Sequence, residues 1–260
     1  MDKSRVIDKY ADYDDRLLAN KILDTVEYCK KNFTYKTTVF LDPKQQSLAA
    51  DLLKREADIA YYAEGGFQNS ERKLYIIYHE DYDAAEIEKP YQILEFSWYS
   101  KSAKKPTHRD LLGSIIGAGI KREMLGDIML QGDSAYVVCS IEVSGYILNN
   151  IERIGNIPVK LQLAEQVTAI EEDSKVINTT VASLRLDSII SAGFGLSRTK
   201  AAELIKSGRV RINWEEKDLT SKVIKQNDVI SLRGKGRIIL EAISGNTKKD
   251  RIKITIKKLV

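Results

Sequence analysis

Closely spaced helix caps and turns divide the last third of the chain into short elements, and this feature constrains the fold most. The apolar residues before Gly193 fit one face of a helix that ends at this glycine. Ser197 is a natural N-cap for a second helix, which Gly208 ends. The segment 210–212 alternates like a strand, and the basic, glycine-containing run 233–237 predicts a tight hairpin. Two short helices against a small twisted sheet are therefore expected.

The charge of the chain is concentrated at its C-terminal end. Residues 181–260 contain 18 Lys and Arg against 8 Asp and Glu. Subtracting these from the totals of 41 and 37 leaves 23 basic and 29 acidic residues in the first 180. The C-terminal part therefore carries a net charge of +10 and the rest −6. A solvated surface explains most lysine runs, but a cationic end of this kind attracts polyanions, of which nucleic acid is the commonest.

The expected helices and strands would bring the basic residues of this region near one another. Arg209 and Arg211 would lie on the polar side of strand 210–212, because apolar residues alternate with them. These cations, and polar residues beside them, are expected to contact phosphates of folded RNA. The C-terminal candidates for RNA contact are Arg185, Ser197, Arg198, Thr199, Lys200, Lys206, Arg209, Arg211, Asn213, Arg233, Lys235 and Arg237.

Two features of this region allow two interpretations each. Arg185 and Asp187 either serve RNA binding or pair with each other to brace the first helix, and for Asp187 we favour bracing. Trp214 either packs against the module or offers a stacking surface to a base. Packing is favoured for Trp214, because a lone aromatic residue more often packs than stacks.

The middle of the chain alternates between strand and helix patterns. Strands are predicted at 91–99, 126–130, 135–140 and 159–163, and helices at 108–120 and 141–151. This β-α-β-β-α-β order is that of a ferredoxin-like fold, which many RNA-recognition domains share. Such domains stack bases on paired aromatic residues of their inner strands, whereas the inner strands here offer only Tyr136. A stacking platform of that type is therefore not expected.

Basic residues surround the first helix of this middle part. Gly113, Gly117 and Gly119 keep the surface of the helix flat, although each glycine costs about 1 kcal/mol relative to alanine. Tight packing of the helix on its sheet would explain them, and so would close approach of another backbone or of a phosphate chain. We favour phosphate contact only for the flanking residues. These are Lys104, Lys105, His108, Arg109, Lys121 and Arg122.

These patterns predict an α+β protein with three domains. The first residues predict an amphipathic helix, then strands at 39–41, 59–62 and 74–78, a helix at 45–54 and a turn at Gly65-Gly66. The acidic, polar stretch 169–179 is expected to be a linker. The domains are a small N-terminal α/β domain at 1–85, a ferredoxin-like, RRM-like RNA-binding domain at 86–168 and an RNA-binding domain at 181–260.

Several classes of function find no support in the sequence. No apolar run approaches the roughly 20 residues that a membrane-spanning helix needs. Cys29 and Cys139 form no C-x-x-C motif and suit a reducing cytosol. His79 and His108 cannot complete a zinc site, and the nucleotide-binding glycine signatures are incomplete. We therefore expect no cofactor, no metal and no catalysis.

Five C-terminal motifs occur in order across residues 183–243. They are Arg185-Leu186-Asp187, Ser197-Arg198-x-x-Ala201, Gly208-x-Val210-x-x-Asn213, Asp228-x-Ile230 and the basic hairpin 233–237. Together they resemble the small RNA-binding module of ribosomal protein S-four, which recurs in tyrosyl-tRNA synthetases and pseudouridine synthases. Trp214 departs from the generic module, which usually has a turn glycine there.

The same resemblance raises an alternative function, an RNA-modifying enzyme of the pseudouridine synthase type. Those enzymes use an aspartate in an R-L-D context. Here, however, Arg185-Leu186-Asp187 opens the binding module itself and is followed by too little chain for a catalytic domain. We therefore favour binding over chemistry.

The stretch 108–128, HRDLLGSIIGAGIKREMLGDI, strongly resembles the central signature of the YlmH family. Phe40-Leu41-Asp42-Pro43, Gly65-Gly66-Phe67 and Glu71-Arg72 match it too, and this branch tends to have an aromatic residue at the position of Trp214. The resemblance implies a bacterial, ribosome-associated RNA-binding protein that acts in quality control of stalled translation. The implied partners are rRNA of the large ribosomal subunit, peptidyl-tRNA and a nascent-chain tailing factor. We expect a cytoplasmic monomer without membrane contact.

Overall fold

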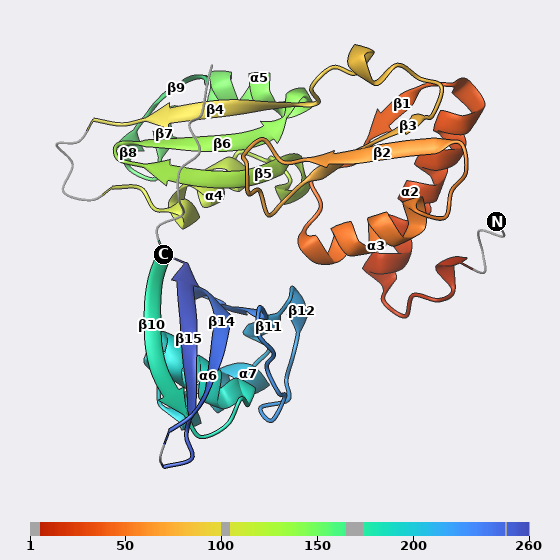
Figure 1. Cartoon of the computed structure of the whole chain (residues 1–260). Helices are drawn as coiled ribbons and strands as arrows, with labels where there is room; N and C mark the ends of the chain where they lie inside the picture. Colours follow the sequence, from red (N-terminus) through yellow and green to blue (C-terminus); the bar gives the residue numbers. More distant parts are fainter. Residues whose placement is uncertain (1–5, 100–104, 165–173, 248, 260) are drawn as a thin grey trace. The chain divides into compact units, whose positions relative to one another are not determined.

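The computed structural model describes residues 6–99, 105–164, 174–247 and 249–259, which fall in two compact units. Unit 1 comprises residues 1–169 and unit 2 residues 170–260, and each is described by itself (Figure 1). None of the helices in the described ranges has the length and apolar character needed to cross a membrane.

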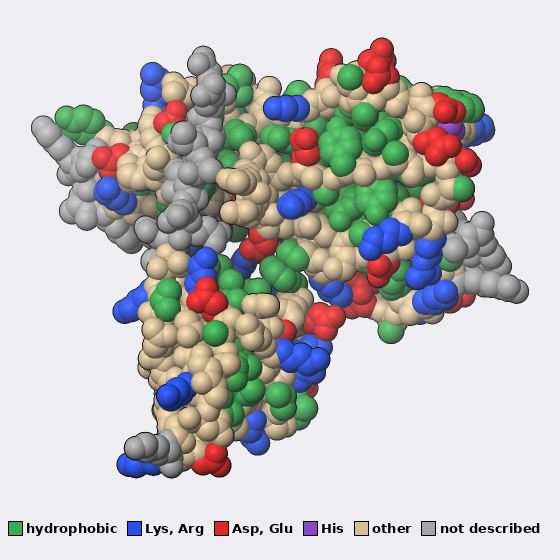
Figure 2. Space-filling view, in the orientation of Figure 1, with side chains coloured by type: hydrophobic (Ala, Val, Ile, Leu, Met, Phe, Trp, Pro, Cys, Tyr) green, Lys and Arg blue, Asp and Glu red, His purple; other side chains and the backbone are tan. Residues whose placement is uncertain are grey.

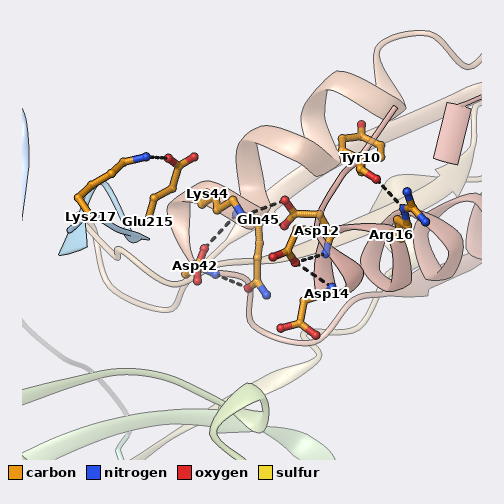
Figure 3. Close-up of polar contacts among 10 residues, drawn as sticks. Tyr10, Asp12, Asp14, Arg16, Asp42, Lys44, Gln45, Glu215 and Lys217 are labelled. Carbon is orange, nitrogen blue, oxygen red and sulfur yellow. Dashed lines mark hydrogen bonds and ion pairs between the residues drawn. The ribbon is translucent and has the colours of Figure 1, made fainter. Parts of the chain in front are cut away.

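The first part of unit 1 is a three-stranded antiparallel sheet with two helices on one face (Figure 1). Its elements are α2 (Tyr13–Asn32), β1 (Tyr35–Thr37), α3 (Pro43–Leu53), β2 (Ile59–Glu64) and β3 (Leu74–His79), with the sheet order β1-β3-β2. The side chain of Asp12 caps α2 by accepting from the N–H of Asp14 at 2.8 Å. Asp42 and Gln45 form a capping box at the start of α3, as Figure 3 shows.

The predicted strand at 39–41 is wrong, because the sheet uses Tyr35–Thr37 instead. Leu41 makes only an isolated bridge to Lys73. The N–H of Phe40 leaves the sheet and donates to the carbonyl oxygen of Glu123, at 2.9 Å, in the next part of the chain.

The second part of unit 1 has the predicted ferredoxin-like topology. Its main elements are β4 (Tyr91–Ser97), α4 (His108–Gly117), β5 (Leu125–Gln131), β6 (Ser134–Ser140), α5 (Ile141–Asn150) and β9 (Lys160–Leu163). Short 3-10 turns lie at η1 (Ala84–Glu86) and η2 (Arg122–Met124). The sheet order is β5-β6-β4-β9 with antiparallel neighbours, which is the arrangement expected for β-α-β-β-α-β. Buried residues of α4 and α5, including Leu111 and Ile147, share a core with Leu94 and Phe96 of β4.

Two details of this part differ from expectation. Helix α4 ends at Gly117, and Gly119 follows with a φ of +92°, so the chain turns before residue 120. A small hairpin of β7 (Arg153–Ile154) and β8 (Ile157–Pro158) precedes β9 and turns at Gly155, whose φ is +57°.

A shared junction, built from the motifs 40–43, 65–72 and 125–127, joins the two parts of unit 1. The carboxylate of Asp127 accepts hydrogen bonds from the backbone N–H of Glu71, at 2.5 Å, and of Arg72, at 3.2 Å. The guanidinium of Arg72 donates to the carbonyl oxygens of Leu125, at 3.1 Å, and Phe40. Burial raises the pKa of Asp127, although the two backbone hydrogen bonds act in the opposite direction.

Apolar contacts complete this junction. Phe40, Leu74, Ile76 and Val138 form one buried cluster that includes residues of both parts. A Cβ atom on Gly126 would lie 2.9 Å from Val138 Cβ and 3.0 Å from Phe40, so only glycine fits here without a shift. The motif residues around Phe40, Arg72 and Asp127 therefore hold the two sheets together.

Unit 2 is a six-stranded sheet with two helices on one face. Its elements are β10 (Ser174–Val181), α6 (Leu186–Phe194), α7 (Arg198–Lys206), β11 (Val210–Ile212), β12 (Glu215–Glu216), β13 (Val229–Leu232), β14 (Gly236–Asn246) and β15 (Ile252–Leu259). The sheet order is β10-β15-β14-β13-β11-β12. Alternate residues of the central strands, such as Val210, Ile230 and Ile238, pack with the helices in one buried core.

Two expectations for unit 2 are corrected. Helix α6 ends at Phe194 with Gly195 as its left-handed cap (φ +65°), one residue later than predicted. Gly193 lies inside the helix, where a Cβ would come within 2.5 Å of the Ile238 side chain. The predicted linker at 169–179 is wrong for its second half, because Ser174–Val181 forms β10 and pairs along its length with β15; residues 169–173 lie outside the described residues.

Candidate nucleic-acid interface

Asp187 organises the first basic residues of unit 2. Its carboxylate is 6% exposed and pairs with Arg198, at 2.7 Å, and with Arg185, at 3.3 Å. Burial alone would raise the pKa of Asp187, but the hydrogen bonds from Arg198 and Arg185 outweigh it and hold this pKa below its ordinary value. The bracing interpretation of Asp187 is thus confirmed, and two half-exposed guanidinium groups are held side by side.

Helix α7 carries the next group of candidates. Ser197 caps the helix by accepting from the N–H of Lys200 at 3.2 Å, and Thr199 is exposed in its first turn. The ammonium of Lys200 pairs with Glu203 at 2.7 Å, which offsets part of its charge. Lys206 lies exposed on the last turn, directly before the chain enters β11.

The strand candidates gather where β11, β13 and β14 meet. A backbone hydrogen bond of 2.9 Å from Arg233 to the carbonyl oxygen of Arg209 joins the start of β11 to the end of β13. Arg211 and Arg237 both align with Ser231 across three strands, so they lie on the sheet face that the helices leave open. Arg211 also pairs with Glu216 at 3.1 Å.

Four of the predicted RNA-contacting cations of unit 2 form no ion pair with any described residue. All four side chains are exposed. They are Lys206, Arg209, Arg233 and Lys235. We call them the unpaired cations, and because no described carboxylate pairs with them, their charge adds in full to the positive field of unit 2.

The expectation of a single cationic face is corrected by this geometry. Arg185, Arg198 and Lys200 lie on the helical side, whereas Arg211 and Arg237 lie on the open face of the sheet. The division arises because Val210 and Ile212 alternate with Arg211 and take the core positions. On the face in Figure 2, Lys and Arg side chains of unit 2 lie in several separate places.

Asn213 has a structural role that its RNA-binding assignment did not foresee. Its side-chain amide donates to Asp228 at 2.9 Å, and its amide oxygen accepts from the N–H of Val229 at 2.9 Å. Asn213 and Trp214 have φ values of +49° and +67° and form a two-residue turn between β11 and β12. Such turns favour Asn followed by Gly, so Trp214 occupies a position that disfavours it.

Trp214 is half-buried, but it is not part of the hydrophobic core that the described residues of unit 2 form. The ion pair between Lys217 and Glu215, at 2.6 Å, lies just after it (Figure 3). The favoured interpretation of Trp214 as a packing residue therefore gains no support from this core.

The structure adds two candidates that sequence reasoning missed. Lys253 and Lys257 of β15 lie on the open sheet face, with Lys257 aligned to Ile239 of β14. The alternation of isoleucine with polar residues in 252–257 was the available signal. Their neighbour Lys258 points the other way and lies 5.6 Å from the ring of Phe194.

In the central part of unit 1 the predicted basic patch is only partly formed. Arg109 and Lys121 are exposed, and His108 begins α4. Lys105 pairs with Asp133 at 2.8 Å, and Lys104 lies outside the described residues. Arg122 also has a structural role, because its guanidinium donates to the carbonyl oxygens of Leu125 and Gly126, at 2.7 and 3.1 Å.

The glycines of α4 are not explained by tight packing on the sheet. Gly113 and Gly117 are exposed, and an added Cβ would meet no atom within 4 Å at either position. An added Cβ would likewise meet no atom within 4 Å at Gly119, which follows α4, or at Gly145 on α5. The flat helix surface therefore faces outward, with Arg109 in the first turn of α4 and Lys121 four residues after its end.

The open face of the central sheet carries an acidic centre instead of an aromatic platform. Glu95 accepts hydrogen bonds from Gln162 at 2.8 Å, Ser134 at 3.1 Å and Tyr136 at 3.4 Å. A carboxylate in this place repels phosphates, which agrees with the expectation that this face is not an RNA-stacking platform. In the part of the chain that the structure describes, no group of three or more His, Cys, Asp or Glu is placed to hold a metal ion.

Three family models match the chain in sequence order. They are "YlmH, N-terminal" at residues 14–82, "Putative RNA-binding domain in YlmH" at 88–168 and "S4 domain" at 184–230. Their ranges contain most of the candidates described above.

Similar proteins fall in two groups. The Bacillus subtilis protein named ribosome-associated protein quality control protein P2 is 29% identical over 249 residues, which are 94% of this chain and 95% of that protein. Small ribosomal subunit protein uS4 of Thermoanaerobacter sp. is 37% identical over 68 residues, 26% of this chain and 32% of that protein. Among solved structures, cell division protein ylmH from Streptococcus pneumoniae is 22% identical with a TM-score of 0.48, covering 60% of this chain and 93% of that chain.

Proposed function

Because the chain belongs to the YlmH family, we propose that it is a non-catalytic RNA-binding protein that acts on ribosomes in quality control of stalled translation. The observation that carries the proposal is the S4 domain with its exposed, unpaired cations, in a chain similar over almost its whole length to a protein named for that process.

We propose that the partners are rRNA of the large ribosomal subunit and peptidyl-tRNA, together with a nascent-chain tailing factor. The protein would then act in the cytoplasm, as a monomer. The positive field of unit 2 and the name of the Bacillus relative support an RNA partner on the ribosome.

The unpaired cations would contact phosphates first, because no internal carboxylate competes for them. Arg198 and Arg185 also have a structural role, because both form ion pairs with the buried carboxylate of Asp187. Their outer N–H groups remain available to RNA, because the two side chains are 54% and 42% exposed. Phosphate contact of this kind positions the protein on a folded RNA by shape and charge.

The alternative, catalysis by Asp187 in the manner of a pseudouridine synthase, finds no support in the geometry. A catalytic carboxylate must reach the substrate, whereas Asp187 is 6% exposed and bound by two arginines.

The test is the salt dependence of binding to purified large subunits and to an rRNA fragment. For Arg209→Ala with Arg233→Ala we expect a weaker affinity and a log K against log salt slope that is smaller by about 1.5, since each phosphate contact contributes about 0.7–0.9. Lys31→Ala with Lys54→Ala, two exposed lysines in α2 and directly after α3, is the charge-matched control. An unchanged slope in the arginine variant would count against the proposal.

A further inference from the structure

Five tyrosines gather on the helix-free side of unit 1. Tyr35 of β1 and Tyr78 of β3 are register partners, and Tyr62 of β2 lies 6.1 Å from Tyr78 between ring centroids. Tyr82 lies 5.4 Å from Tyr35, and Tyr91 begins β4. We call these five residues the tyrosine face.

The opposite face of this sheet is the one that α2 and α3 cover. Tyr61 and Tyr75 are each an odd number of residues from Tyr62 and Tyr78 along their strands, so they point to this opposite face. They pack against the helices on that side. The tyrosine face instead covers the buried junction cluster around Ile76 and keeps all five side chains partly exposed. Figure 2 shows hydrophobic side chains, a class that includes tyrosine, gathered over this sheet, with acidic side chains along its outer margin.

Acidic residues surround the tyrosine face. The segment 80–95, which supplies Tyr82 and Tyr91, contains six Asp and Glu and one basic residue, Lys89. Glu64 accepts a hydrogen bond from the hydroxyl of Tyr91, and burial together with this carboxylate raises the pKa of Tyr91 to about 12. The pKa of Tyr82 is raised as well, chiefly by burial and to a smaller extent by the carboxylate of Glu86. The hydroxyl edges of the face therefore lie in a negative field.

Lys36, although it belongs to β1, does not neutralise this face. Its ammonium lies 3.7 Å from the ring centroid of Tyr28, on α2. Glu95, at the centre of the adjoining sheet face, extends the negative field further along the same side.

Aromatic rings and carboxylates together select one kind of partner. Tyrosine is enriched at interface centres, and its ring face attracts lysine and arginine side chains. Nucleic acid and anionic lipid would be repelled by the surrounding carboxylates. We propose that the tyrosine face is a docking surface for a lysine- or arginine-rich segment of a protein partner.

The test uses the full chain and a fluorescent decapeptide of alternating arginine and glycine, with a glutamate–glycine decapeptide as the probe of opposite charge. We expect the arginine peptide to bind and the glutamate peptide not to bind. Tyr62→Ala with Tyr82→Ala should weaken binding about tenfold, which corresponds to the loss of two cation–π contacts. Tyr13→Ala with Tyr99→Ala removes two tyrosines that are each 76% exposed elsewhere and should change nothing.

A second variant leaves the apolar core intact in case the tyrosine variant unfolds. Glu86→Gln with Glu88→Gln should weaken binding severalfold, whereas Glu27→Gln with Asp51→Asn, exposed acids of α2 and α3, should not. Equal binding to all variants, or no binding of the arginine peptide to the wild type, would overturn the proposal. So would binding of an RNA oligonucleotide that the tyrosine variant loses.

The same variants separate this proposal from the RNA-binding function. The tyrosine and glutamine variants should keep wild-type affinity for rRNA, and Arg209→Ala with Arg233→Ala should keep wild-type affinity for the arginine peptide. Failure of rRNA binding in the wild type would therefore refute the proposed function without touching the tyrosine face.

Discussion

At the scale of single residues, the polar contacts decide which side chains remain available to a ligand. Arg122 and Asn213 were expected at an RNA surface, yet both use their polar atoms within the fold. Their partners explain why the sequence did not reveal it. Asp228 lies fifteen residues after Asn213, and the bonds of Arg122 go to backbone carbonyls, which have no sequence signature.

The left-handed backbone at Trp214 allows its two interpretations to be separated. A left-handed residue other than glycine costs about 1–2 kcal/mol, so Trp214→Gly relieves this strain while it removes the side chain. If Trp214 does not pack in the core, we expect the free energy of unfolding to change by less than about 1 kcal/mol, far below the roughly 3–5 kcal/mol typical of a core aromatic. Denaturant unfolding measures this difference.

The same variant tests stacking. If a base stacks on Trp214, Trp214→Gly should weaken RNA affinity by about 1–3 kcal/mol, and Trp214→Phe should restore most of it. A large loss of stability together with unchanged RNA affinity would instead establish Trp214 as a packing residue.

At the scale of secondary-structure elements, α4 has an exposed glycine surface that the fold of unit 1 does not need. Gly113→Ala with Gly117→Ala should stabilise unit 1 by up to about 2 kcal/mol, because each alanine is favoured in a helix by about 1 kcal/mol and meets open space. Thermal unfolding measures this gain. If a phosphate backbone approaches the helix closely, the same variant should bind rRNA more weakly.

Gly145→Ala on α5 is the matched control, since its Cβ also meets no atom within 4 Å and it lies away from Arg109 and Lys121 in the sequence. A stabilised α4 variant with wild-type rRNA affinity would show that no ligand needs the flat surface.

Some elements of the fold could be predicted from the sequence, and others could not. The ferredoxin-like order of the central part was predictable because each strand and helix has its own periodicity and the turns are marked. Strand β10 was missed because its polar sequence resembles a linker and its partner, β15, lies more than seventy residues away. Strand β1 was misplaced because Phe40 and Leu41, apolar enough for a strand, serve the junction instead.

At the scale of the whole molecule, the junction of unit 1 relates its two parts. We propose that 1–85, 86–168 and 181–260 are the three domains of the chain, with β10 attached to the third. The junction between the first two is polar as well as apolar, since Arg72 and Asp127 bridge it through backbone groups.

Removing the guanidinium of Arg72 should therefore weaken both parts of unit 1 together. Arg72→Ala leaves the carbonyl oxygens of Phe40 and Leu125 without this donor. We therefore expect the free energy of unfolding of unit 1 to fall by about 2 kcal/mol. Hydrogen exchange should show lower protection in β2 and in β6 alike. Lys73→Ala, at the adjacent position, is the control, and a loss confined to β2 would contradict a shared junction.

The pairing of β10 with β15 has a consequence for how the protein is made. Ser174 aligns with Leu259, so the sheet of unit 2 joins two strands that are synthesised more than seventy residues apart. While residues 252–259 are still inside the exit tunnel, β10 has no neighbour and β14 lacks one of its two. Completion of this sheet, and of the open face that carries Lys253 and Lys257, must therefore wait until residues 252–259 have left the exit tunnel.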